Sequence, residues 1–329
     1  MKKKRLAGLV LALPLALLCA CGGGTPDLAL SSNWYLDPAE KEVKTNTREE
    51  LEYEVTFTPA ETERAFKLVY TNGVYKTTLE DDTVDGVHVY RYSTALNINV
   101  QFFLNGAESE VFADSVTSET VFLSVREHLR PLSSKVTVKS TSPISSNPSA
   151  LREDVAYESY HYIMTTTYAD EKLETATMVF EDLLKEEKLE PQSIDIEGGG
   201  TYLDNEQIAF ALRGLSMNAA VTFRSINPVT RRETDVKITQ TPTQVSEPVS
   251  FSLNYFGGET AEEVPQSLPA YQAVLAYSAS MSGEPVTFTY ARPSERTFRN
   301  VLLKMEKPIL QSLGTMTYVL KKATFNHGV

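Results

Sequence analysis

The stretch Leu51-Glu52-Tyr53-Glu54-Val55-Thr56-Phe57 decides the fold class of this protein. Apolar side chains occupy every second position in it, and glutamate or threonine fills the positions between. Because successive side chains of a β-strand point to opposite faces of a sheet, this alternation predicts a strand with one buried and one solvent-facing side. The same alternation recurs over residues 249–255, 286–290 and 316–320.

Further segments rich in β-branched and aromatic residues extend this pattern along the chain. They cover residues 87–92, 120–125, 136–139, 157–168, 219–225 and 234–239. Such segments, bounded by Gly, Asn, Pro or Ser, are typical of half-buried antiparallel strands. The dipeptides Asn72-Gly73 and Asn105-Gly106 are the strongest signals for tight hairpin turns. The sequence therefore predicts a mainly β protein, with a large antiparallel curved sheet or open barrel and one or two short helices.

Helical signals are few. Asp204 and Gln207 have the spacing of a capping box, and an apolar helical face follows over residues 208–215. We therefore expect a short helix from Asn205 to Leu215. The segment 181–189, EDLLKEEKL, allows two interpretations, a second helix or a charged hairpin tip.

The N-terminus has the features of an export signal. Residues 2–5 are Lys-Lys-Lys-Arg, and residues 6–18 are apolar apart from Gly8 and Pro14. That apolar stretch is shorter than the roughly 20 residues that a transmembrane helix needs. Both cysteines of the chain, Cys19 and Cys21, follow directly.

The segment 18–21, Leu-Cys-Ala-Cys, resembles a bacterial lipobox, in which a small residue precedes the cleavage site and a cysteine follows it. The resemblance implies that Cys21 becomes the first residue of the mature chain and carries a diacylglyceryl group with palmitate-type acyl chains. Cleavage before Cys19 would instead place the bulky Leu18 at the cut. Each buried methylene of such chains contributes about 0.8 kcal/mol to membrane binding. The alternative is an ordinary secretory signal with incidental cysteines.

This N-terminus predicts both the location and the domain organisation of the protein. We expect a lipid-anchored protein of the cell membrane that faces outside the cytoplasm. Residues 1–20 would be the lipoprotein signal, residues 21–45 the lipidated cysteine and tether, and residues 46–325 a β-rich extracytoplasmic body. The Ser- and Pro-rich segment 140–152 is a candidate internal break, either between two β-domains or as one long loop of a single body, and the second interpretation is favoured.

Charge and residue spacing exclude several functions. The formal net charge is −12, and removal of a signal with four basic and no acidic residues would leave it near −16. This acidity argues against nucleic-acid binding. The histidines lack metal-ligand spacing, and the chain has no nucleophile-elbow motif. We therefore expect a non-catalytic protein with no cofactor and no metal site.

Aromatic residues in the predicted strands are the candidates for lining a ligand site. Tyrosine combines an apolar ring with a polar tip, which suits the wall of an amphiphile pocket. The candidates are Tyr90, Tyr92, Tyr160, Tyr162, Phe288 and Tyr290. The alternative is that they are ordinary strand residues, because strands favour aromatics.

Four arginines lie inside otherwise apolar segments, namely Arg91, Arg126, Arg130 and Arg213. An anion-binding role is one interpretation. A structural ion pair with a buried carboxylate, such as that of Asp114 or Asp204, is favoured over it.

The order of several short motifs resembles an uncharacterised family of exported bacterial β-proteins. The motifs are residues 50–55, 112–122, 128–132, 203–207, 212–215 and 314–320. In that family a domain of unknown function forms a curved sheet or open barrel, similar in shape to periplasmic lipoprotein-localisation carriers. The resemblance covers residues 50–322 and implies a curved β-sheet with an apolar concave face.

Two functions follow from these observations. The first is a membrane-anchored extracytoplasmic protein that binds or carries an apolar or amphiphilic ligand, and it predicts a cavity of several hundred cubic ångströms. The second is a non-catalytic envelope scaffold or protein-interaction module, which predicts a filled core and an exposed patch or strand edge. The membrane, through the lipid on Cys21, is the expected partner in both cases. A lipid or other amphiphile is a further partner in the first and an envelope protein in the second.

Overall fold

The computed structural model describes residues 48–326, apart from 62–65, 105–106, 124–128, 144–156, 170–172, 197–200, 215–220, 228–230, 241–244, 259–261, 278–284, 292–299 and 310–312. The predicted export signal and tether, with Cys19 and Cys21, lie outside these residues. No helix among the described residues is both long and apolar enough to cross a bilayer.

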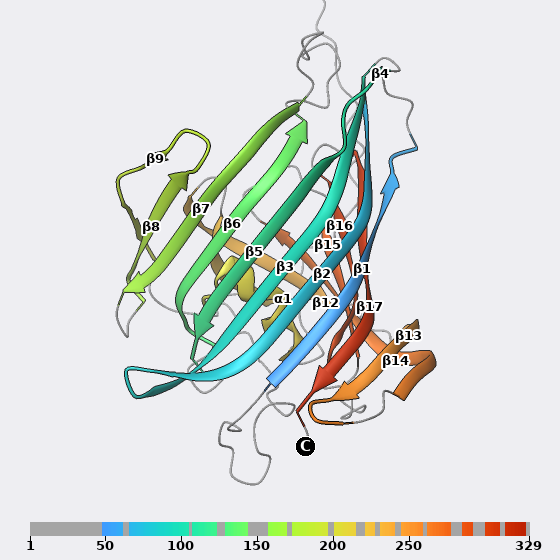
Figure 1. Ribbon diagram of the computed structural model, residues 1–329. Coiled ribbons are helices and arrows are strands. Elements are labelled where there is room, and N and C mark those ends of the chain that lie inside the picture. Colours follow the sequence, from blue (N-terminus) through green and yellow to red (C-terminus); the bar gives the residue numbers. More distant parts are fainter. Residues whose placement is uncertain are drawn as a thin grey trace, which may run out of the picture.

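The described chain forms a single curved sheet of 17 strands, which confirms the predicted fold class (Figure 1). The strands are β1 (Arg48–Pro59), β2 (Phe66–Val84), β3 (Val87–Leu104), β4 (Ala107–Glu108), β5 (Phe112–Phe122), β6 (Pro131–Pro143), β7 (Tyr157–Ala169), β8 (Thr175–Asp182), β9 (Glu187–Lys188), β10 (Gln192–Asp195), β11 (Val221–Asn227), β12 (Arg232–Gln240), β13 (Val245–Tyr255), β14 (Glu262–Tyr277), β15 (Val286–Ala291), β16 (Leu302–Pro308) and β17 (Gly314–Phe325).

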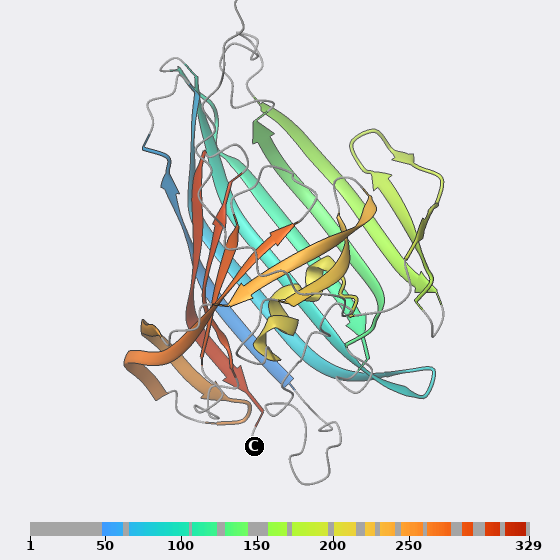
Figure 2. The ribbon, with the colours of Figure 1, turned by 180° about the vertical axis from the view of Figure 1, so that it is seen from behind.

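The strands pair in a row that curls into an open barrel. Antiparallel pairs connect β8, β7, β6, β5, β3, β2, β1 and β17 in that order, and the row continues through β16, β15 and β14 to β12 and β11. The end of β13 pairs in parallel with β17, and the rest of β13 forms an antiparallel hairpin with β14. In Figure 2 the wall formed by β14, β15, β16 and β17 lies in front of the long strands β2, β3 and β5.

One short stretch of chain joins the two ends of the row. Strand β10 pairs with β8 at one end. A few residues later, the N–H of Leu203 donates to the carbonyl of Arg224 at 2.9 Å, and the N–H of Arg224 donates to the carbonyl of Thr201 at 3.0 Å. Because Arg224 belongs to β11, β10 contacts one end of the strand row and residues 201–203 contact the other end.

A short helical segment lies inside this barrel (Figure 2). It consists of a 3₁₀ turn, η3 (Asn205–Gln207), the helix α1 (Ile208–Ala211) and a second turn, η4 (Leu212–Gly214). Its first turn carries the predicted capping box: the carboxylate of Asp204 accepts from the N–H of Glu206, and the side chain of Gln207 accepts from the N–H of Asp204. The predicted helix is therefore confirmed, and the segment 181–189 takes its other interpretation, a hairpin tip between β8 and β9.

The helical segment packs against the inner face of the barrel. Phe210 packs against Tyr92 and Phe122, with ring centroids 5.4 Å and 5.2 Å apart. Ile208, Phe210 and Leu212 belong to one buried cluster with the inward residues of β1, β3, β14, β15 and β17. The interior wall of the barrel is thus packed against the helical segment at this level.

One hairpin prediction is wrong. Asn72-Gly73 does not turn the chain; it lies within β2, where the register with β3 shifts between Thr71 and Val74. The turn between β2 and β3 is instead Asp85-Gly86, both with positive φ, at 50° and 80°. Asn72 also has a positive φ of 54°, so its local conformation suits a bulge as well as a turn. Residues 105–106 lie outside the described residues, but Leu104 and Ala107 on either side of them pair as in a hairpin.

The first four residues of the candidate break at 140–152 belong to β6, and β7, which follows it, pairs with β6. β6 and β7 pair from Ser133 and Thr167 to Pro143 and Tyr157. Residues 144–156 therefore connect neighbouring strands of the same sheet.

Candidate functional site

The candidate site is a groove at the place where β1 and β2 separate. The two strands pair from Arg48 and Glu80 up to Val55 and Gly73, and the pairing ends there. Beyond that point β1 continues to Pro59 along β17, and residues 66–71 of β2 remain paired with β3. The seam between β1 and β2 is therefore open over residues 56–59 and 66–72 (Figure 1).

The bulge at Asn72-Gly73 is the cause of this separation. A bulge inserts an extra residue into one strand and bends it away from its neighbour. Gly73 is required at this point, because a Cβ atom there would lie 2.6 Å from the carbonyl oxygen of Val55 and 2.7 Å from its Cβ. The backbones of β1 and β2 thus approach closely at Gly73 and diverge immediately beyond it.

The groove has a volume of about 760 Å³. It is lined by residues 52–57 of β1, residues 70–74 of β2 and Lys321 of β17. Because consecutive residues of both strands line it, the main chains of β1 and β2 form its walls. Tyr53 and Val55 among the lining residues also belong to the buried core.

Two aromatic rings form the floor of the groove. Phe57 and Tyr70 meet edge to face across the seam, with centroids 5.2 Å apart. Both are half-buried, and both pack against an apolar cluster that contains Leu68, Phe102 and Leu313. Burial, with a smaller contribution from the carboxylate of Asp114, raises the pKa of Tyr70 to about 12, so its hydroxyl stays neutral at physiological pH.

Charged side chains form the rim on the outer face. Lys321 Nζ lies 3.0 Å from a carboxylate oxygen of Glu54, and Lys76 Nζ lies 2.8 Å from one of Glu52. All four side chains are at least two-fifths exposed, so these pairs contribute little to stability. An apolar floor beneath a mixed-charge rim gives the groove an amphiphilic character.

Four of the predicted ligand-lining residues lie in the packed interior. Tyr90, Tyr92, Phe288 and Tyr290 are buried in the cluster around the helical segment. The hydroxyl of Tyr290 donates to the carbonyl of Ala209 at 2.7 Å, so it anchors the helix to β15.

The other two predicted residues lie on β7, away from the groove. Tyr160 is 39% exposed, and its hydroxyl donates to Glu158 at 3.0 Å. Tyr162 is half-buried and packs against Phe180, with centroids 5.0 Å apart. Neither these residues nor the four interior aromatics line the groove.

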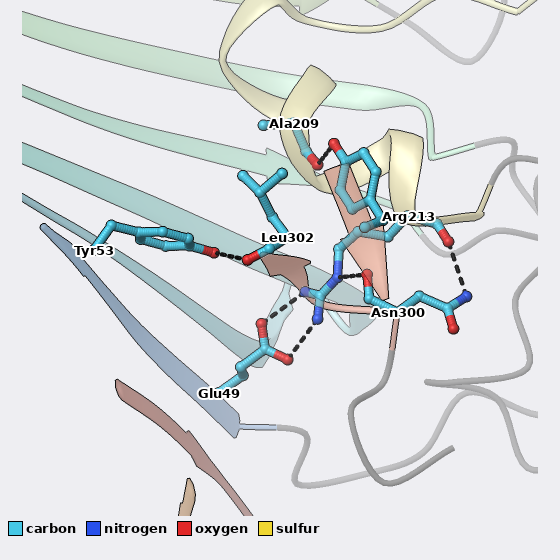
Figure 3. Close-up of polar contacts among 7 residues, drawn as sticks. Glu49, Tyr53, Ala209, Arg213, Asn300 and Leu302 are labelled. Carbon is cyan, nitrogen blue, oxygen red and sulfur yellow. Dashed lines mark hydrogen bonds and ion pairs between the residues drawn. The ribbon is translucent and has the colours of Figure 1, made fainter. Parts of the chain in front are cut away.

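Arg213 makes the structural ion pair that was expected, but with Glu49 rather than Asp114 or Asp204 (Figure 3). Its Nη1 and Nη2 donate to the two carboxylate oxygens at 2.7 Å and 2.9 Å, and both side chains are at most 3% exposed. Burial alone would lower the pKa of Arg213, but the facing carboxylate of Glu49 outweighs it and the net pKa lies above the usual value. Asn300 completes the cluster by donating to the carbonyl of Arg213 at 3.0 Å.

The two carboxylates first considered as partners of Arg213 have other roles. Asp204 accepts hydrogen bonds from the hydroxyls of Ser134 and Tyr168, so it ties the helix start to β6 and β7. Asp114, on β5, accepts from the backbone N–H of Thr141 at 2.9 Å. Burial raises the pKa of Asp114 to about 6.

No metal centre is present among the residues that the structure describes, where no group of three or more His, Cys, Asp or Glu side chains could hold an ion. His88 pairs with Asp81 at 3.5 Å at the end of the β2–β3 hairpin. Of the other histidines, His128 and His327 lie outside the described residues.

The groove is the feature that sequence reasoning missed. Phe57 belongs to the alternating stretch that identified β1, and Asn72-Gly73 was recognised as an unusual backbone position. The signal that could have located the site is their combination, because a left-handed asparagine and a glycine inside a long strand mark a bulge next to an edge.

These features define a β-barrel-like protein with a helix-filled interior and a groove at one seam. One solved structure with a similar fold is the crystal structure of a beta-barrel-like protein of domain of unknown function DUF1849 from Brucella abortus. The similarity has a TM-score of 0.47 at 10% sequence identity and covers 85% of this chain and 98% of that chain. No family model and no curated protein matches the chain.

Proposed function

We propose that this protein is a membrane-anchored extracytoplasmic binding protein that holds an apolar or amphiphilic ligand in the groove between β1 and β2. The observation that carries the proposal is the groove itself, with about 760 Å³ of space, an aromatic floor and a charged rim. That volume is in the range of ordinary ligand sites, which span roughly 300–1,000 Å³.

The packing of the barrel directs the ligand to this groove rather than to the interior. Tyr90 and Tyr290 are fully buried, and the helical segment occupies the space between the walls. Entry of a ligand there would require the helix to leave a core that it fills, with loss of its buried hydrogen bonds. The groove requires no such rearrangement.

The membrane anchor of the proposal is the lipid on Cys21. The lipobox-like segment 18–21 supports it, and the anchor would place the β-body at the membrane, outside the cytoplasm. The test is metabolic labelling with a clickable palmitate analogue, followed by membrane fractionation. The label should enter the wild-type protein and be lost from Cys21→Ser, but not from Cys19→Ser. Equal labelling of the Cys21→Ser variant would refute the anchor.

Ligand binding is tested by photo-crosslinking. The full-length protein in nanodiscs is incubated with a photoactivatable long-chain fatty acid, and the crosslinked peptides are mapped by mass spectrometry. We expect crosslinks in residues 52–57 and 70–74 and their loss in Phe57→Ala, with Thr117→Ala on the outer face of β5 as the matched control. Crosslinks spread evenly over the barrel, or confined to the interior aromatics, would refute the groove as the site.

The filled interior also favours a second function, a non-catalytic envelope scaffold or protein-interaction module. In that case the helical segment is a structural support and the outer surface does the binding. Crosslinking in cells would then recover an envelope protein on the barrel surface, with the groove left free of any ligand.

A further inference from the structure

We propose that the ligand of the groove is an extended, amphiphilic polypeptide segment of a partner protein, bound as an added β-strand between β1 and β2. This inference rests on the proposed function, since it takes the groove as the binding site and names the ligand class. It follows from the direction of the backbone hydrogen-bonding groups that line the groove.

The backbone of β1 presents hydrogen-bonding groups to the groove. In an antiparallel strand, successive residues direct their N–H and C=O groups to opposite neighbours. The carbonyl of Arg48 accepts from Asn326 at 3.1 Å, and the N–H of Ala60 donates to the carbonyl of Leu313 at 3.1 Å. Both bonds point toward the β17 side, so the even-numbered residues of β1 face β17. Phe57 and Pro59 therefore direct their main-chain groups toward β2 and the open seam.

The backbone of β2 presents groups to the groove from the other side. On β3, the N–H of Ser109 donates to the carbonyl of Phe102 at 2.9 Å, so the even-numbered residues near Phe102 face away from β2. The odd-numbered residues of β3 therefore face β2, where Gln101 pairs with Val69. Val69 on β2 therefore faces β3, and its neighbours Leu68 and Tyr70 direct their main-chain groups toward β1.

Two strand edges thus face each other across the seam, and their chemistry distinguishes between ligands. Water can satisfy the edge groups while the groove is empty. An acyl chain laid over them would remove that water and offer no hydrogen bond in return, so we expect it to bind more weakly than a polypeptide strand in the same groove. A polypeptide strand restores the hydrogen bonds, as in other cases of strand addition to an open sheet edge.

The side chains of the groove define the sequence character of this strand. Phe57 and Tyr70 cover the inner side of the seam, so inward residues of the added strand would be apolar or aromatic. The outer rim carries Glu54 and Lys321, so the outward residues of the added strand, which alternate with the inward ones, would be polar. Since β1 and β2 are antiparallel, the added strand must be parallel to one of them and antiparallel to the other. Pro59, which has no N–H, marks the end of the β1 edge and limits the strand to about six residues.

The test measures binding of fluorescent peptides of about six residues to the full-length protein in nanodiscs, by fluorescence anisotropy. The parent peptide alternates valine or phenylalanine with serine. A second peptide has the same composition with its apolar residues adjacent, and a third is the parent with N-methyl groups on alternate backbone nitrogens. We expect the N-methylated peptide to bind at least about tenfold more weakly, because it lacks two or three backbone donors, and the rearranged peptide to bind more weakly as well.

Groove variants localise the binding. Phe57→Ala should weaken the parent peptide by about tenfold, and Thr117→Ala, on the outer face of β5, should leave its affinity unchanged. The comparison of parent and N-methylated peptides uses the wild-type protein and therefore does not depend on the folding of a variant.

The outcomes separate this inference from the proposed function. Equal affinity for the parent and the N-methylated peptide would overturn strand addition. Crosslinking of the fatty-acid probe to the groove without binding of the parent peptide would also overturn it, while the proposed groove function would stand. If neither the probe nor the peptide binds, both the groove function and this inference are wrong.

Discussion

Replacing Arg213 by methionine should destabilise the protein strongly, because it leaves the buried carboxylate of Glu49 without its partner. The two side chains form a bidentate pair at 2.7 Å and 2.9 Å, and they are 3% and 1% exposed. Removal of one member of such a buried pair typically costs about 3–5 kcal/mol. The reverse change, Glu49→Leu, leaves an unpaired buried guanidinium and should cost a similar amount.

The double variant Glu49→Leu/Arg213→Met provides the decisive measurement. Both charges are then absent and the site is filled by apolar side chains of similar size, so the double variant should lie within about 2 kcal/mol of the wild type. The coupling energy between the two positions should therefore exceed about 3 kcal/mol in a double-mutant cycle. The assay is urea unfolding of the purified protein followed by far-ultraviolet circular dichroism, with the slope against urea compared among all four proteins.

Two results would refute this reasoning. One is a cost below about 1 kcal/mol for either single variant, which would mean that water reaches the pair and screens it. The other is a double variant as unstable as the sum of the single variants. In that case the hydrogen bonds between Arg213 and Asn300, which join the helical segment to the chain just before β16, would contribute more than the ion pair with Glu49 on β1.

Three further changes test other parts of the structure. Gly73→Ala should destabilise the protein by about 1–3 kcal/mol, since the new methyl group would overlap the Val55 carbonyl. The control Thr117→Ala should change the free energy of unfolding in urea by less than about 0.5 kcal/mol. Equal stability of the two variants would contradict the close approach of β1 and β2. Asp114→Asn should stabilise the protein by about 1–2 kcal/mol at neutral pH but not at a pH below 3.8, the ordinary pKa of the group. The pKa of Asp114 in the folded protein is about 6, so the stability of the wild type declines as the pH rises from 3.8 to 6. Urea midpoints measured across this pH window check the prediction, and a gain of the same size at low pH would exclude titration as the cause. Tyr290→Phe should cost about 0.5–1.5 kcal/mol through loss of the hydroxyl bond to Ala209, and a neutral effect on the urea midpoint would mean that this bond does not hold the helix.

Several features of the fold could be predicted because they depend on neighbouring residues alone. The alternation in residues 51–57 identified β1, and the same alternation extended back by two residues places Glu49 on the inner face with Leu51 and Tyr53. The capping box of Asp204 and Gln207 located the helix start correctly. Each of these signals acts within a few residues of chain, where propensity and side-chain direction are decided locally.

The groove between β1 and β2 could not be predicted in this way. Asn72-Gly73 has the same local conformational preference in a hairpin turn as in a bulge, and only its pairing with β3 on one side and Val55 on the other decides between them. The aromatic residues of the strands could likewise line a cavity or fill a core. The position of the helical segment, which comes from a distant part of the chain, decided that Tyr92 and Tyr290 are core residues.

The antiparallel strands with one apolar face and the short capped helix could be predicted from the sequence, because those properties follow from the period of the side chains and from local hydrogen bonds. The pairing of Arg213 with Glu49, 164 residues away, and the opening of the seam between β1 and β2 beyond Gly73 could not. The physical reason is that register, barrel closure and burial depend on contacts between segments remote in the chain. Such contacts are selected by the packing of the whole molecule and not by the residues on either side of each position.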